Sequence, residues 1–79
     1  MEVLKFKTNI SDDRRMAKAA PFLDKLDEVV HWEIDTSTEE NILSVAGKGL
    51  DPQRVENALR EAGFTSEILR IQGIGGESL

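Results

Sequence analysis

The stretch TNISDDRRMAKAA, Thr8–Ala20, leads from a polar loop into a helix and decides the fold. Ser11 is of a residue type that caps helices, and Asp12 and Asp13 follow it in the first turn, where the helix dipole favours negative charge. Apolar residues then recur at helical spacing and form the stripe that we expect to be buried: Met16, Ala19, Ala20, Leu23 and Leu26. We predict one helix that continues through Pro21 with a kink there, because proline removes a backbone donor.

Alternation of apolar and polar residues predicts strands on both sides of this helix. In VLKFK, residues 3–7, Leu4 and Phe6 share one face. In VVHWEID, residues 29–35, one face holds Val30, Trp32 and Ile34, and the other holds His31, Glu33 and Asp35. The polar turn TSTEEN, residues 36–41, then joins this strand to ILSVAG, residues 42–47, as a hairpin.

A second helix has clear start and stop signals. Asp51 is a capping residue and Pro52 suits the first helical position. Gly63 is the expected stop, after an apolar face made of Val55, Ala58, Leu59 and Ala62. TSEILRI, residues 65–71, supplies a fourth strand, and QGIGGESL, residues 72–79, lacks periodicity and is predicted to be a flexible C-terminal tail.

The predicted order is therefore βαββαβ, the ferredoxin-like arrangement of the α+β class. It implies a four-stranded antiparallel sheet with two helices on one face. The other face of the sheet is left open to water or to a partner. We predict one domain over residues 1–71, followed by the tail at 72–79.

Composition excludes several classes of function. The formal net charge of −5, from 10 basic and 15 acidic residues, repels phosphate backbones, so we expect no nucleic-acid partner. The absence of cysteine excludes disulfides and thiolate metal sites. No stretch approaches the roughly 18 apolar residues of a membrane span, so we expect no membrane contact and a cytoplasmic location.

We find no catalytic constellation in the sequence. The chain has one histidine, His31, which the strand pattern places on the open face of the sheet. No nucleophile is paired with a base, so we do not expect an enzyme. The oxygen-rich run DTSTEEN lacks the central glycine of a calcium loop and is better interpreted as the hairpin turn.

Several segments resemble the heavy-metal-associated domain family of copper chaperones and P-type ATPase modules: the opening stretch, VVHWEID, SVAG and VENALREAGF. In that family the loop before the first helix reads MxCxxC, and its two cysteines hold Cu(I) or Zn(II). Ile10 matches the methionine, Asp12 the first cysteine and Arg15 the second, with Asp13 and Arg14 between them. The resemblance implies the fold, while the ligand pair is missing.

The sequence leaves three interpretations of SDDRR open. Soft Cu(I) needs sulfur ligands, so we expect no metal and no cofactor. Asp12 and Arg15 have the i,i+3 spacing of a helical ion pair, which would supply the counter-charge internally. Alternatively, all four charges are simply solvated, or the arginines and backbone donors at the helix start receive an anion.

Three hypotheses of function follow. The first is a non-catalytic interaction or regulatory module that binds a protein partner through the open sheet face, an edge strand or the charged loop, with Phe22 as a candidate anchor. The second is metal binding or trafficking through Asp12, Asp13 and, as a further ligand, His31. The third is a small-molecule sensor, since amino-acid-binding ACT modules share the strand order.

Overall fold

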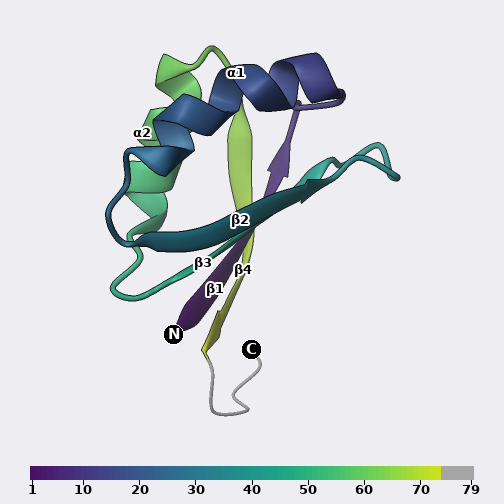
Figure 1. Ribbon diagram of the computed structural model, residues 1–79. Coiled ribbons are helices and arrows are strands. Elements are labelled where there is room, and N and C mark those ends of the chain that lie inside the picture. Colours follow the sequence, from purple (N-terminus) through teal and green to yellow (C-terminus); the bar gives the residue numbers. More distant parts are fainter. Residues whose placement is uncertain (74–79) are drawn as a thin grey trace.

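A computed structural model describes residues 1–73 of the chain. Its elements follow the predicted βαββαβ order: β1 (Glu2–Thr8), α1 (Asp13–Asp24), β2 (Val29–Asp35), β3 (Ile42–Gly47), α2 (Pro52–Glu61) and β4 (Ser66–Gly73). The four strands form one antiparallel sheet in the order β2-β3-β1-β4. Both helices lie on one face of this sheet, as Figure 1 shows. The predicted fold class is confirmed.

The core lies between the helices and the sheet. Leu4 and Phe6 point into it from β1, as the alternation predicted, and Leu43 and Val45 do so from β3. The helices contribute their predicted stripes, with these residues buried: Ala19 and Leu23 from α1, and Val55, Ala58 and Leu59 from α2. Burial of these side chains is the main force that holds so short a chain together.

The predicted face of β2 is wrong at Val30. Trp32 and Ile34 pack against the core, but Val30 is 66% exposed. The pairing of β2 with β3 shifts between Val29 and His31, so Val30 is an extra residue in a β-bulge. A bulge breaks the two-residue period, and alternation alone therefore misplaces this side chain.

The other edge strand contains a similar irregularity. The pairing of β1 with β4 shifts between Lys5 and Phe6, which leaves Leu69 unpaired between Ile68 and Arg70, and Leu69 is 49% exposed. Bulges on both edges twist the outer strands and hinder edge-to-edge association. β4 also extends to Gly73, beyond the predicted strand end at Ile71, and residues 74–79 of the predicted tail lie outside the described residues.

The start and stop signals predicted α2 correctly and α1 only in part. In α2, the Asp51 carboxylate accepts from the Gln53 amide, Pro52 is the first helical residue and Gly63 adopts a φ of +95°, all as predicted. α1 continues through Pro21 but ends at Asp24, so Leu26 packs on the core from the following turn and not from the helix. No helix within residues 1–73 has the length and apolar character needed to cross a membrane.

Candidate functional site

The candidate site is the loop between β1 and α1, which contains the positions predicted to match a metal loop. Asp12, not Ser11, caps the helix: its backbone is extended and its Oδ1 accepts a 2.8 Å hydrogen bond from the Arg15 amide. Asp13 is therefore the first helical residue. The prediction of Ser11 as the cap is off by one position because serine and aspartate are both good caps, and the sequence offers them side by side.

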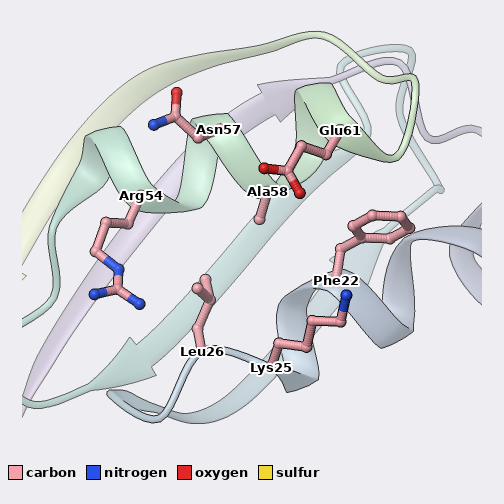
Figure 2. A pocket seen from close by; sticks show the side chains of 7 residues that line it. All are labelled: Phe22, Lys25, Leu26, Arg54, Asn57, Ala58 and Glu61. Atoms are coloured by element: carbon pink, nitrogen blue, oxygen red, sulfur yellow. The ribbon is translucent and has the colours of Figure 1, made fainter.

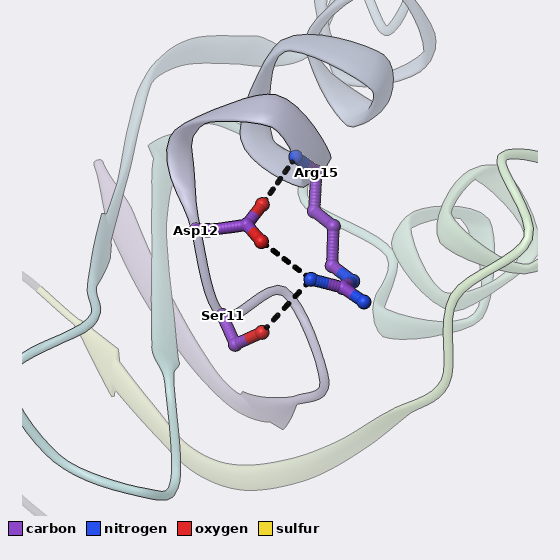
Figure 3. A network of polar contacts seen from close by, with 3 residues as sticks. All are labelled: Ser11, Asp12 and Arg15. Carbon is purple, nitrogen blue, oxygen red and sulfur yellow. Dashed lines mark hydrogen bonds and ion pairs between the residues drawn. The ribbon is translucent and has the colours of Figure 1, made fainter.

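Asp12 also forms the predicted ion pair with Arg15. Arg15 Nη1 lies 2.5 Å from Asp12 Oδ2, and the same nitrogen donates to the Ser11 hydroxyl at 3.4 Å, as Figure 3 shows. Both carboxylate oxygens of Asp12 thus accept hydrogen bonds from Arg15, one from its backbone and one from its side chain. The side chains are about half exposed, so the pair organises the loop more than it stabilises the domain.

The electrostatics of the loop favour the charged form of Asp12. The hydrogen bond from the Arg15 amide lowers the pKa of the Asp12 carboxyl, and the positive charges of Arg15 and Arg14 lower it further. Asp12 is therefore an anion at neutral pH whose charge is balanced by the chain itself. Of the three interpretations of SDDRR, the internal ion pair is the one observed.

The segment before the cap is fixed by three contacts. Ile10 is fully buried, and its amide donates to the Thr8 hydroxyl at 3.2 Å. The Asn9 carboxamide oxygen accepts a 3.0 Å hydrogen bond from the Thr65 amide and thereby joins the loop to the start of β4. These contacts hold the loop to β1 and to the start of β4. Ile10 is a core residue, and the resemblance matches it to an apolar residue, the methionine of the metal loop.

A hollow of about 480 Å³ adjoins the loop, and we call it the loop-end hollow. Arg14, Arg15 and Lys18 line one side of it, opposite the turn that follows α2. The Lys18 ammonium lies 5.9 Å from the centre of the Phe64 ring, within range of a cation–π contact. The remaining lining residues are Asn9, Asp12 and Gly63.

The sequence predicted only some of the residues that line this hollow. Asp12, Arg14 and Arg15 were predicted site residues and line it, whereas Asp13 is exposed at the first position of α1 and does not line it. Lys18 was missed, although its spacing of four residues from Arg14 indicated a shared helix face. Phe64 was missed because its approach to α1 depends on the tertiary fold.

His31 lies far from the loop. Its neighbour across the sheet is Ala46, which pairs in turn with Val3, five residues before Thr8 on β1. At about 3.3 Å per residue, this separates His31 from the end of β1 by roughly 16 Å along the strands. Within residues 1–73, no group of three or more His, Asp or Glu side chains is placed to hold a metal ion. The fold therefore does not bring His31 to Asp12 and Asp13.

The donors present in the loop do not fit a soft metal ion. The chain has no thiolate, and both carboxylate oxygens of Asp12 are engaged by Arg15. The guanidinium of Arg15 places a permanent positive charge where the resemblance expected the second ligand. A cation entering this position would have to displace that group.

A second concavity lies between the two helices. Phe22 and Leu26 face Ala58 across a groove of about 230 Å³, with Arg54 and Glu61 at its rim, as Figure 2 shows. Phe22 is half-buried and packs against the core, with the Lys25 ammonium 5.1 Å from its ring centre. The observation agrees with partial exposure of Phe22, and its role as a partner anchor stays a prediction.

Comparison with solved structures shows that other proteins share this fold. The chain superposes on a copper-binding domain from HMA7, a P-type ATPase, with a TM-score of 0.79 and 14% identity, over 92% of this chain and 100% of that one. The yeast copper transporter domain Ccc2a gives a TM-score of 0.77 at 17% identity, over 89% and 97% of the two chains. The chain has the fold of heavy-metal-associated domains.

A third solved structure has the same fold. The HMA domain of the copper chaperone for superoxide dismutase, in its apo form, gives a TM-score of 0.71 at 18% identity, over 100% of this chain and 76% of that one. No protein-family model and no curated relative matches the sequence. The likeness therefore concerns the fold, which the resemblance predicted, and function has to be argued from the residues of this chain.

Proposed function

We propose that this chain is a non-catalytic interaction module that binds an acidic protein partner directly at the loop-end hollow. The observation that carries this proposal is the Asp12–Arg15 pair, which closes the loop with charges of the chain itself. A loop organised in this way presents a preformed surface, and preformed surfaces lose less entropy on binding.

The charges around the loop-end hollow support an acidic partner. Asp12 is neutralised by Arg15, so Arg14 and Lys18 supply the remaining positive charge on this side of the hollow. Lys18 and Phe64 together offer an aliphatic stem and an aromatic ring beside the ammonium. The chain as a whole carries a charge of −5, so an acidic partner would be steered to this end and repelled elsewhere.

A titration followed by amide NMR tests the proposal. A short polyglutamate peptide serves as the acidic probe, and a polylysine peptide of equal length serves as the charge control. We expect polyglutamate, and not polylysine, to shift the amides that border the hollow, with an effect that weakens as salt is added. The double variant Arg14→Glu/Lys18→Glu should weaken binding by about tenfold or more.

The double variant Lys25→Glu/Lys48→Glu is the matched control, because it reverses two charges at exposed lysines that do not line the loop-end hollow. It makes the same type of charge change without touching the hollow and should leave most of the binding intact. Equal losses in the two variants would show that only total charge matters. Shifts that avoid the hollow would contradict the proposed surface.

Metal binding through oxygen ligands is the alternative function. It would require Asp12 to exchange its two hydrogen bonds with Arg15 for a hard cation. Zn(II) and Mg(II) titrations of the same sample distinguish it, because a bound ion would shift Asp12 and Arg15 first.

A further inference from the structure

The face of the sheet away from the helices carries two rows of opposite charge. On β2, Glu33 and Asp35 are exposed and alternate with Ile34, which packs against the core. On β1, Lys5 and Lys7 alternate in the same way with the buried Phe6. The acidic row and the basic row therefore point to the same open face, one on each side of β3.

The strand register places these charges at matching heights. Glu33 and Lys5 are both paired with Ser44 of β3, one from each side. Asp35 is paired with Ile42, and Lys7 lies one step beyond the Phe6–Leu43 pair, level with Ile42. Each acidic residue thus has a lysine directly across β3.

The two rows do not neutralise each other within one chain. They are two strand spacings apart, about 9–10 Å between backbones. Among residues 1–73, no ion pair joins a side chain of one row to the other. The small side chain of Ser44 lies between them, in a hollow of about 560 Å³ lined also by Lys5, Glu33 and Asp35.

This pattern is self-complementary under a two-fold rotation about an axis parallel to β3. This rotation places a second copy face to face with the first. The β2 strand of the second copy then lies over β1 of the first copy, and every residue keeps its height along the strands. Glu33 then meets Lys5 of the second copy, and Asp35 meets Lys7 of the second copy. Each pair occurs twice, as an isologous interface requires.

We propose that two copies of this chain associate through their open sheet faces, about an axis along β3. Ile42, Ser44 and Ala46 of β3 lie along that axis, and the small side chains of Ser44 and Ala46 leave room for the sheets to approach to the usual spacing of about 10 Å. The Glu33–Lys5 pairs set the register of the two copies. The loop-end hollow remains exposed in each copy, so this inference does not depend on the proposed function.

Asp35 and Lys7 each have a polar neighbour within the same chain, so Glu33–Lys5 is the pair to test. Asp35 Oδ1 accepts hydrogen bonds from the amide and hydroxyl of Ser37, so only Oδ2 is available to the second copy. Glu67 of β4 lies beside Lys7 in the strand register and offers its ammonium a carboxylate within the same chain. Glu33 is exposed, and among residues 1–73 it makes no ion pair.

Sedimentation equilibrium of the full chain, at low and high salt, measures the association. We expect a monomer–dimer equilibrium at low salt that shifts to monomer as salt is added. Glu33→Lys and Lys5→Glu should each raise the dimer dissociation constant by about tenfold or more, because two attractive pairs become repulsive. The swap Glu33→Lys/Lys5→Glu should restore it to near the parent value.

Glu39→Lys is the control for Glu33→Lys. Glu39 is exposed in the hairpin turn, and the two substitutions change the net charge of the chain by the same amount. Circular dichroism checks that each variant is folded. Restoration by the swap, with little effect of the control, supports the interface. A chain that stays monomeric at about 1 mM in low salt would overturn the proposal. So would a dimer that Glu33→Lys leaves unchanged or that the swap fails to restore.

Discussion

The Thr8 hydroxyl donates a 2.6 Å hydrogen bond to the backbone oxygen of Asn41, which lies 33 positions further along the chain. The same hydroxyl accepts from the Ile10 amide at 3.2 Å. Asn41 adopts a φ of +46°, a conformation that asparagine tolerates better than most residues. One buried hydroxyl therefore joins the end of the β2–β3 hairpin to the loop that contains the Asp12–Arg15 pair.

Thr8→Val tests this junction. The substitution keeps the shape of the side chain but leaves the Asn41 carbonyl and the Ile10 amide without their buried partner, at an expected cost of about 1–3 kcal/mol in unfolding free energy. Urea denaturation measures the change. Thr65→Val, at an exposed position, is the matched control and should cost much less. Equal losses would show that the cost comes from β-propensity or packing and not from the buried hydroxyl.

Gly47 is required by the close approach of another backbone segment. A Cβ at this position would lie 1.9 Å from the Glu28 carbonyl oxygen and 2.9 Å from Leu50 Cδ2. Gly47→Ala must therefore displace the start of β2 and should destabilise the fold by about 2 kcal/mol or more, measured by urea denaturation.

Gly49→Ala separates this steric effect from backbone strain. Gly49 has a φ of +64°, and a Cβ there meets no atom within 4 Å, so only the strain of the left-handed conformation applies, about 1 kcal/mol. A larger loss for Gly49→Ala than for Gly47→Ala would contradict the steric explanation.

Acidification should weaken the fold through two aspartates. The Ser37 side chain and amide, which hydrogen-bond to Asp35, lower the pKa of its carboxyl below the ordinary 3.8, and the Arg15 amide has the same effect on the pKa of Asp12. A carboxyl whose pKa is lower in the folded state contributes stability above 3.8. That contribution is lost as the pH falls through the folded-state value.

Urea denaturation between about pH 5 and pH 2 measures this loss. The variant Asp12→Asn/Asp35→Asn should be less stable than the parent at neutral pH and should lose less stability on acidification. Asp13→Asn is the control, because it removes a neighbouring carboxylate that does not cap the helix. A double variant with the same pH slope as the parent would show that other carboxylates dominate.

Much of the fold was predictable because local signals and packing agree. Asp51, Pro52 and Gly63 bound α2 as their conformational preferences predict, and the alternation in β1 places Leu4 and Phe6 in the core. The i,i+3 spacing of Asp12 and Arg15 made their ion pair one of the three interpretations that the sequence left open, and it is the one observed. These features depend on residues that are near in sequence.

The remaining features depend on contacts between distant segments. Val30 is exposed because a bulge shifts the pairing with β3, and no local pattern indicates a bulge. Phe64 meets Lys18 only because the turn after α2 lies beside α1 in the folded chain. The alignment of Glu33 with Lys5 across Ser44 likewise requires the register of three strands.

We propose that the Asp12–Arg15 pair stands where the resemblance places a metal site. The most direct test records amide NMR spectra of the chain during additions of Zn(II), Mg(II) and, under anaerobic conditions, Cu(I). We expect the amides from Ile10 to Arg15 to stay unchanged at micromolar metal, because Asp12 is engaged by Arg15 and no thiolate is present. Shifts confined to these residues and saturating at micromolar metal would contradict the claim.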